Sequence, residues 1–457
     1  MPRCGLAGLE VNAVNNGVET VSMRRMSLYV LTAASMACLA ITAYAQAPVA
    51  VPSPAVTPAT SENARDVLSR VRPAVIQIRG FFGSNTAQAF HGSGFAVAAD
   101  GVFMTNYHVV AQKVQYPDKY RLEYRTAEGK TGRITVLAID VRHDLAVVRA
   151  AGLAPAPLKL EPVVPVKGDR AYSIGFPLDV GLTITEGVSN GRVEDSFDPR
   201  IHYSGAINGG MSGGPALNAA GEVIGVNVSG YIFTQLVAFL VPAEHAQALL
   251  DRALKQKPGA GSLRKDVLAQ LRAHATDLLG ALDGAMPTQV TAGYALPAKL
   301  APFIDCIASG DPAPDQPVHI VRINCSAKAG LYVQQGLYGG NLKYSHFVLS
   351  TSKLDAWRFA RQLSDGAFAF GEHGSRRHVG PFSCNNRIVG LKGFDAGVLV
   401  CVRGYRKFEG LYDFTVRVSS LNGSKRGFAS HLDMFGLEFE AGLRFIKRYV
   451  DALEWKP

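Results

Sequence analysis

The feature that most constrains this chain is a series of short apolar stretches separated by turn residues, which runs from Ala74 to about Val241. Examples are AVIQIRG, GSGFAVAADG, FMTNYHVV, DLAVVRA, AYSIGFP and EVIGVNVSG, with Gly, Asp-Gly or Pro between them. Many short strands at such spacing are typical of a β-barrel or a β-sandwich. The 47 glycines among 457 residues also suit a turn-rich β protein better than a helix bundle.

A change of period after Pro242 predicts that helices follow the β region. Apolar residues recur at helical spacing over 243–255 and again over 263–282. We therefore assign 61–250 to the β domain and 251–286 to a helical connector.

The remaining residues, 287–457, are expected to form a separate, mixed α/β C-terminal domain of unknown family. Strand-like runs such as HIVRINC, HFVLSTS, GVLVCVRGY and LYDFTVRVSS surround one expected helix at 353–362. A last helix is expected at 437–453.

The N-terminus carries the pattern of an export signal. Two arginines precede an apolar or small stretch at 27–43, and the tripeptide AYA that follows has the small-x-small form of a cleavage site. We expect 1–45 to be an N-terminal extension and signal peptide, and 46–60 to be a Pro/Ala-rich linker. The mature protein is expected to be periplasmic or secreted, with membrane attachment only if the signal segment stays uncleaved.

Four cysteines lie in the C-terminal region, and an even number in an exported chain favours disulfides over metal or redox use. They allow three connectivities. We favour Cys306–Cys325 and Cys384–Cys401, because each cysteine lies on or beside a strand-like run and a short segment separates the members of each pair. Four free thiols are the alternative.

The segment GGMSGGP at 209–215 places a serine between glycines. A serine hydroxyl is a weak nucleophile that needs a base and an oxyanion site. Glycines on both sides allow a tight turn in which the N–H groups of Gly210 and Ser212 point at one oxygen. Ser212 is therefore a candidate nucleophile, and a Gly-rich turn between strands is the structural alternative.

His108 and an aspartate are the candidate base and its partner. His108 follows an apolar strand pattern in TNYHVV, although a lone histidine is more often structural. Asp144 adjoins the apolar strand in HDLAVV, where a carboxylate is costly unless it is paired. Holding an imidazole in one tautomer would pair it. Asp140 is the competing acid, and we prefer Asp144 because it adjoins the strand directly.

Together these segments resemble the trypsin-like serine proteases, and most closely the bacterial Deg/HtrA group. The matching stretches are GSGFAVAADGVFMTNYHVV, DVRHDLAVVRA, SIGFPLDVGLTITEGVSNGRV and INGGMSGGPALNAAGEVIGVNV, within about 64–250. The resemblance implies a chymotrypsin fold of two perpendicular six-stranded barrels with a triad in the cleft between them. It implies that His108 takes the Ser212 proton, that Asp144 orients His108, and that Gly210 and Ser212 form the oxyanion hole.

Two departures from the family pattern stand out. Met211 occupies the position where the family usually has Asn, or Asp in digestive enzymes. Without that Asp, activation through a salt bridge to a freed N-terminus is not expected. The peptide-binding PDZ domains that usually follow the protease in the Deg/HtrA group are not recognisable after Leu250.

The same resemblance implies a primary substrate pocket with its floor near Ala206. Its walls would come from Asn227, Val228 and Ser229, and from the region of Phe239. Because no acidic residue stands at the floor position, an Arg or Lys side chain would be an unpaired buried charge there. We therefore expect cleavage after small or medium apolar residues.

The leading hypothesis is a serine endopeptidase that acts on protein or peptide substrates through an acyl-enzyme, without a metal or cofactor. The net charge is +10, but the basic residues are scattered, so we expect no nucleic-acid partner. One alternative is a catalytically silent protease fold used as a binding module, supported only by Met211. Another is an exported carbohydrate- or envelope-binding protein. The C-terminal domain, which has no triad or metal-ligand pattern, is expected to dock onto a partner or substrate.

Overall fold

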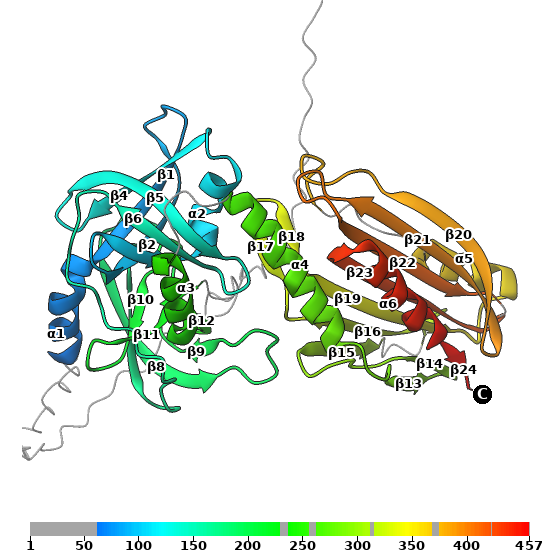
Figure 1. The fold of residues 1–457 in the computed structure, drawn as a ribbon. Coiled ribbons are helices and arrows are strands. Elements are labelled where there is room, and N and C mark those ends of the chain that lie inside the picture. The colour runs from blue at the N-terminus through cyan, green and yellow to red at the C-terminus, as the bar shows by residue number, and fades with distance from the viewer. Residues whose placement is uncertain are drawn as a thin grey trace, which may run out of the picture. The chain divides into compact units, whose positions relative to one another are not determined.

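Two closed six-stranded β-barrels come first in the described chain (Figure 1), as the resemblance to the chymotrypsin fold implies. The computed structural model describes residues 62–228, 236–255, 262–310, 315–367, 374–421 and 423–456, so the expected signal peptide and linker lie outside the described residues. The first barrel has the strand order β1-β2-β3-β6-β5-β4, and β1 pairs with β4 to close it. Its strands are β1 (Val75–Phe82), β2 (Gln88–Ala98), β3 (Val102–Thr105), β4 (Tyr120–Thr126), β5 (Thr131–Asp140) and β6 (Leu145–Ala150).

The second barrel has the strand order β10-β11-β12-β9-β8-β7, and β7 pairs with β10 to close it. Its strands are β7 (Arg170–Gly175), β8 (Thr183–Arg192), β9 (Ile201–Tyr203), β10 (Pro215–Leu217), β11 (Val223–Asn227) and β12 (Ala238–Pro242). All of the pairings in both barrels are antiparallel, and closure leaves neither barrel with an unpaired edge strand.

Successive residues of a barrel strand belong to different hydrophobic clusters, as the two-residue period of a strand requires. In β1, Ile76 and Ile78 lie in a cluster with Phe103. Val75, between Ala74 and Ile76, lies instead in a cluster that includes Tyr172 of the second barrel. Burial on both faces of these strands explains why their sequences are almost continuously apolar.

Two of the helices of this part of the chain, α3 (Ala243–Lys255) and α4 (Leu263–Ala281), lie close to the positions that the change of period predicts. The others are α1 (Glu62–Val71) and α2 (Tyr107–Gln115), with short 3-10 helices η1 (Arg72–Ala74) and η2 (Pro177–Asp179). Helix α4 joins two cores, because Val267 and Leu271 lie in the cluster of the first barrel and Leu278 lies in that of the C-terminal region. Among the described residues, no helix is both long enough and apolar enough to span a membrane.

A seven-stranded antiparallel sheet dominates the C-terminal region, with the order β15-β16-β19-β23-β22-β21-β20. Its strands are β15 (Ile304–Gly310), β16 (His319–Ala327), β19 (Asn341–Ser350), β20 (Ser383–Leu391), β21 (Phe394–Gly404), β22 (Leu411–Ser420) and β23 (Arg426–Glu438). The smaller elements are β13 (Thr288–Thr291), β14 (Tyr294–Pro297) and β24 (Glu454–Trp455), which form a three-stranded sheet, and the hairpin of β17 (Leu331–Gln334) and β18 (Leu337–Gly339).

Two helices pack on opposite faces of the large sheet. Helix α6 (Phe439–Asp451) shares a cluster with Phe428 and Leu432 of β23. Helix α5 (Ala356–Ala367) shares another cluster with Ala429, which points the other way because neighbouring strand residues alternate. The C-terminal region is therefore mixed α/β, as the sequence predicts.

Each edge of the large sheet carries one disulfide. Cys306 of β15 is bonded to Cys325 of β16, and the two residues are direct partners in the strand register. Cys384 of β20 is bonded to Cys401 of β21 in the same way at the other edge. Both favoured pairs are thus present, and each links an edge strand covalently to its inner neighbour.

The C-terminal region and the first barrel share a hydrophobic cluster. Tyr107 and Val110 of α2 belong to it, together with Leu331, Val333 and Leu337 of the β17–β18 hairpin. The sheets are separate, but the cores are joined, which the expectation of an independent accessory domain did not include.

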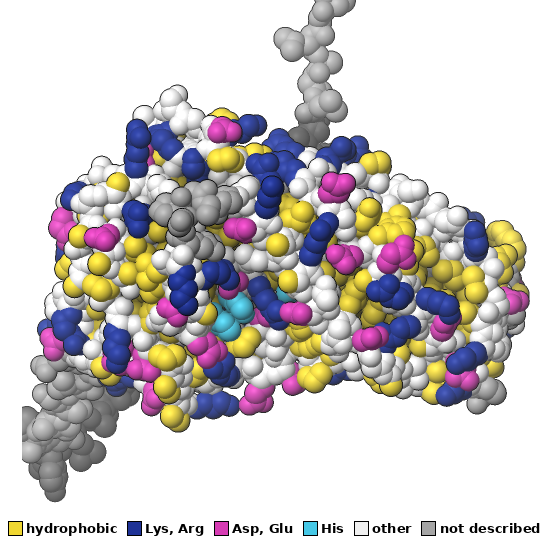
Figure 2. Space-filling model, in the orientation of Figure 1, with side chains coloured by type: hydrophobic (Ala, Val, Ile, Leu, Met, Phe, Trp, Pro, Cys, Tyr) yellow, Lys and Arg dark blue, Asp and Glu magenta, His cyan; other side chains and the backbone are white. Residues whose placement is uncertain are grey.

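The surface carries charges of both signs. Figure 2 shows Lys and Arg side chains interspersed with Asp and Glu side chains over the face in view. This agrees with the scattered basic residues of the sequence, whose formal net charge is +10.

Candidate active site

His108 lies in the first turn of α2, directly after strand β3. The strand ends at Thr105 and Asn106 is the N-cap residue of the helix. The Asn106 side chain donates a hydrogen bond to the main-chain oxygen of Asp144 (2.8 Å) instead of capping its own helix. The sequence pattern predicted His108 at the end of a strand. In the structure the strand ends before His108, which lies in the helix that follows.

Asp144 holds His108 at two points. Its Oδ1 accepts a hydrogen bond from the His108 main-chain N–H (2.8 Å), and its Oδ2 lies 2.6 Å from His108 Nδ1. The Tyr107 N–H donates to the main-chain oxygen of Asp144 (3.1 Å). Because Nδ1 faces a carboxylate, the proton is placed on Nδ1 and the lone pair of Nε2 is left available.

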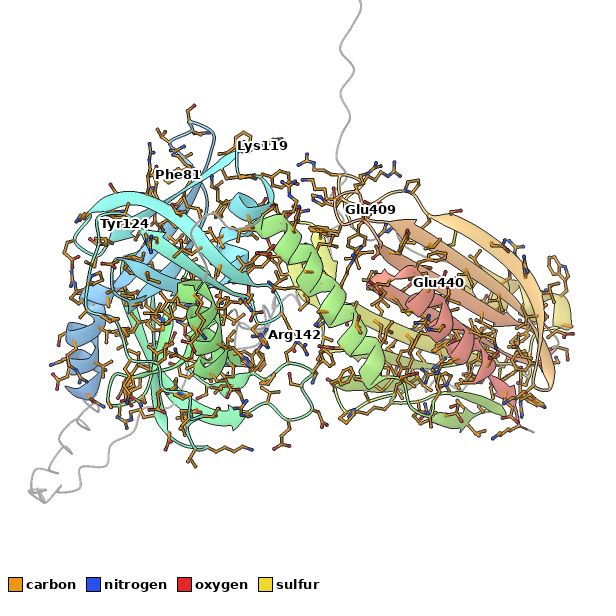
Figure 3. All side chains as sticks on the ribbon, viewed as in Figure 1. Phe81, Lys119, Tyr124, Arg142, Glu409 and Glu440 are labelled. Atoms are coloured by element: carbon orange, nitrogen blue, oxygen red, sulfur yellow. A yellow bond between two sulfur atoms is a disulfide. The ribbon has the colours of Figure 1, made fainter. Side chains whose placement is uncertain are left out.

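The turn that carries Asp144 is fixed from several sides. Asp144 has a φ of 56°, in the left-handed region that Asp tolerates better than most residues. The Arg142 side chain binds Asp277 of α4 (2.5 Å) and Asp198 (2.6 Å), and it lies beside α4 in Figure 3. The Val141 N–H donates to the side-chain oxygen of Gln270 of α4 (2.7 Å). Helix α4 therefore anchors the turn that positions the candidate acid.

Asp140, the competing acid, has a different partner. Its two oxygens lie 3.0 Å from the main-chain nitrogen and 2.9 Å from Nδ1 of His143. Asp144 and not Asp140 therefore contacts His108.

The pKa of His108 reflects two opposing effects. Burial lowers the pKa, because it disfavours the imidazolium ion. The charge of Asp144 and its hydrogen bond raise it by more, so that the pKa of His108 is raised from its ordinary value. Asp144 therefore stabilises the protonated imidazole that a general base becomes after it accepts a proton.

The loop before and after Ser212 requires glycine at two positions. Gly210 has a φ of 100° and Gly213 a φ of 84°. A Cβ on Gly210 would lie 2.3 Å from the Phe176 oxygen, and a Cβ on Gly213 would lie 2.3 Å from the Ser93 oxygen. Neither backbone angle nor space admits a side chain, so this loop conformation depends on the glycines of GGMSGGP.

The peptide that joins Gly209 to Gly210 is oriented by a hydrogen bond. The Gly209 oxygen accepts from the Leu178 N–H (2.9 Å), so the N–H of Gly210 points in the opposite direction across the trans peptide. Ser93 fixes the same loop, because its hydroxyl donates to the Gly210 oxygen (2.7 Å) and its N–H donates to the Ser212 oxygen (2.8 Å). Within the described residues, the N–H groups of Gly210 and Ser212 have no acceptor. Two free donors at these positions suit a developing oxyanion.

Met211 is fully buried, so its side chain does not line an open cleft. Its main-chain N–H donates to the Asn208 oxygen (3.0 Å), and its own oxygen accepts from the Gly214 N–H (3.0 Å). The long apolar side chain is thus accommodated in the interior without disturbing the two free donors of the loop.

The Ser212 loop lies against the segment that leads into α2. A Cβ on Gly213 would come within 2.9 Å of the Asn106 nitrogen, and one on Gly92 within 3.2 Å of the Ser212 oxygen and 2.5 Å of the Val109 side chain. Within the described part of the chain, the Ser212 hydroxyl makes no hydrogen bond to His108. Catalytic hydrogen bonds of this kind often tighten only when substrate is bound.

The expected pocket residues do not form one wall. Ala206 is exposed, and its oxygen accepts a hydrogen bond from the Thr185 hydroxyl (2.8 Å). Val228 is half-buried against the cluster between the barrels. Ser229 lies outside the described residues.

Asn227 and Phe239, the other two expected pocket residues, have different surroundings. The buried Asn227 side chain donates to the oxygens of Ile174 (3.1 Å) and Met211 (3.3 Å), so it braces the Ser212 loop from inside. Phe239 packs against His202, its cross-strand partner, and these two residues line a different cavity, which Arg192 also lines. These contacts do not identify either side chain as a pocket wall, so the assignment of both residues stays a prediction.

One residue near His108 was missed by the sequence reasoning. The ring of Tyr332, in β17 of the C-terminal region, lies edge-on to the His108 ring with a centroid distance of 6.1 Å. No pattern in the sequence marks this tyrosine, because it comes from a region without a recognisable motif.

The comparison with known families agrees with this geometry. Residues 92–226, which include His108, Asp144 and Ser212, match the family model of the trypsin-like peptidase domain. This part of the chain is therefore similar to trypsin-like peptidase domains. Within the described residues, no group of three or more His, Cys, Asp or Glu side chains is arranged to hold a metal ion.

Relatives of the peptidase domain are named serine proteases. The chain is 34% identical over 224 residues to the mitochondrial serine protease HTRA2 of Bos taurus, an alignment that covers 46% of this chain and 47% of the relative. It is 32% identical over 180 residues to a probable periplasmic serine endoprotease, DegP-like, of Chlamydia pneumoniae, covering 37% of this chain and 35% of the relative. The chain thus spans about half or less of the length of these relatives.

Proposed function

We propose that this chain is an exported serine endopeptidase that uses Ser212, His108 and Asp144. The observation that carries the proposal is the two-point contact of Asp144 with His108, next to a loop whose Gly210 and Ser212 N–H groups are free. The match to a trypsin-like peptidase domain and the names of the relatives support the same reaction class.

In the proposed mechanism the Ser212 oxygen attacks the carbonyl carbon of the scissile bond, and its proton passes to Nε2 of His108. The negative charge that forms on the carbonyl oxygen is stabilised by the N–H groups of Gly210 and Ser212. The peptide C–N bond breaks as the imidazolium gives its proton to the leaving amine. An ester between the substrate acyl group and Ser212 remains.

Water then hydrolyses the ester by the reverse sequence of proton transfers. His108 takes a proton from the attacking water and returns it to the Ser212 oxygen as the ester bond breaks. Asp144 keeps the imidazole in the productive tautomer through both halves of the reaction and stays ionised. No metal or cofactor takes part.

We further propose that small or medium apolar residues precede the cleaved bond. Ala206, the proposed floor, has no charged side chain, and the polar Asn227 side chain is turned inward. A basic side chain would therefore lose its hydration without gaining a countercharge.

Export is proposed on three observations. The N-terminal segment has the composition of a signal peptide. The two disulfides of the C-terminal sheet require an oxidising compartment such as the periplasm or the extracellular space. One relative is itself named a probable periplasmic endoprotease.

Ser212→Ala tests the proposal with a protein substrate such as casein. Because Ser212 is the proposed nucleophile, proteolysis is expected to fall by about 10⁶-fold while the thermal unfolding temperature stays unchanged. Activity within tenfold of the unmodified protein would exclude Ser212 as the nucleophile. Inactivity of the unmodified protein towards casein and a peptide library would instead favour a binding module.

A further inference from the structure

The β17–β18 hairpin of the C-terminal region is attached to the helix that carries His108. The Tyr107 hydroxyl donates a hydrogen bond to the Val333 main-chain oxygen (2.8 Å) and accepts one from the Gln115 side chain (3.2 Å). Leu331 and Val333 are buried in the same hydrophobic cluster as Tyr107. The hairpin is therefore held against α2 by both a buried hydrogen bond and apolar packing.

Tyr332 lies on the opposite side of β17 from these buried residues. Leu331 and Val333 are buried in the cluster, whereas Tyr332, the residue between them in the strand, packs against the cluster and is only half-buried. Its ring packs edge-on against His108 (6.1 Å, 78°) and against Tyr338 across the hairpin (5.5 Å, 77°). The residue is half-buried, so part of it faces solvent beside the candidate base.

The Tyr332 hydroxyl has no hydrogen-bond partner among the described residues. Burial, then the nearby Tyr338 and then the charge of Asp144, raise the pKa of Tyr332 to about 12. The phenol therefore stays protonated at neutral pH. Its O–H remains a free donor, on which the charge of Asp144 acts. A tyrosine that served only to fill a core would be expected to bury its ring and pair its hydroxyl, as Tyr107 does.

We propose that Tyr332 forms a wall of the substrate cleft beside His108, so that the C-terminal region completes a specificity subsite of the peptidase. The inference rests on the proposed peptidase function of Ser212, His108 and Asp144. The ring offers an apolar face to the substrate side chain that lies next to His108, and the hydroxyl donates to a substrate oxygen. Polypeptides with an apolar side chain at that position are the favoured substrates.

The test compares Tyr332→Ala and Tyr332→Phe in the full-length protein. Cleavage of a peptide library, varied at each position around the scissile bond, gives kcat and KM for each variant. Tyr332→Ala is expected to lower kcat/KM about 10- to 100-fold for peptides with the favoured apolar residue, mainly through KM, and to flatten the preference at one position. Tyr332→Phe keeps the ring and is expected to keep that preference.

Gln335→Ala is the matched control, because Gln335 is an exposed residue in the turn of the same hairpin. It is expected to leave the library profile unchanged. The rate of labelling by a small fluorophosphonate probe, which does not extend along the cleft, is expected to stay within about twofold in all three variants.

Two outcomes would overturn the inference. One is a Tyr332→Ala library profile identical to that of the unmodified protein. The other is an equal loss of probe labelling and of cleavage of every peptide, which would mean that Tyr332 only supports the position of α2. Failure of the proposed function is distinguishable, since the unmodified protein would then neither label with the probe nor cleave any peptide.

Discussion

Asp144→Asn is the substitution whose effect follows most directly from the geometry. Both oxygens of the Asp144 carboxylate face hydrogen-bond donors of His108. One accepts from the main-chain N–H at 2.8 Å, and the other lies 2.6 Å from Nδ1. An asparagine has one acceptor oxygen and one NH₂ group, so it cannot accept from both. If its oxygen keeps the main-chain contact, its NH₂ faces Nδ1 and drives the proton to Nε2.

The expected loss can be estimated from this conflict. A proton on Nε2 removes the lone pair that accepts the Ser212 proton, and the protonated imidazole loses its carboxylate partner. Together these changes are expected to lower kcat by about 10⁴-fold, or about 5 kcal/mol of transition-state stabilisation. The charge of Asp144 also raises the pKa of His108, so the acidic limb of the pH profile of kcat/KM should move to lower pH in the variant.

A fluorogenic peptide assay from pH 4 to about 9 measures both effects in one experiment. Asp140→Asn is the control, because Asp140 binds His143 and does not contact His108. It is expected to keep activity within a few-fold of the unmodified protein. A larger loss in Asp140→Asn than in Asp144→Asn would refute the assignment of the acid, and so would an Asp144→Asn activity within tenfold of normal.

Three further predictions concern the loop, the disulfides and the specificity. Gly213→Ala should abolish fluorophosphonate labelling, because the added Cβ would meet the Ser93 oxygen at 2.3 Å; normal labelling would argue against the loop geometry. Replacing Cys384 and Cys401 together by Ser should lower the free energy of unfolding by about 3 kcal/mol in urea titrations, and no change would mean that the bond does not form. Library profiling should show small or medium apolar residues before the cleaved bond; a preference for Arg or Lys would contradict the proposed pocket.

The candidate nucleophile and the candidate acid could be predicted because each is marked by a local pattern. The glycines around Ser212 are needed for its loop, and the apolar strand after Asp144 makes an unpaired carboxylate there unfavourable. Helix α3 (Ala243–Lys255) spans the same residues as the predicted helix, since its apolar period is regular. These features depend on sequence neighbours, so a single sequence carries enough information for them.

The pocket and the shared core could not be predicted, because they depend on contacts between distant residues. Asn227 and Phe239 lie on the expected strands, but the direction of each side chain depends on the register of β11 with β10 and β12, and of β12 with β9. Tyr332 meets His108 only because the hairpin packs on α2, and no residue pattern near 332 indicates this partner. The sequence also did not predict that Leu331 and Val333 share a hydrophobic cluster with the first barrel, because these residues are distant from it along the chain.

The most direct test of the central claim is intact-mass analysis of the full-length protein after reaction with a fluorophosphonate, followed by peptide mapping of the adduct. The proposed function predicts one added group per chain, located on Ser212, and no adduct in Ser212→Ala. Labelling should also fall strongly in Asp144→Asn and remain near normal in Asp140→Asn. An adduct on another residue, or no adduct on a folded protein, would contradict the assignment of Ser212 as the nucleophile.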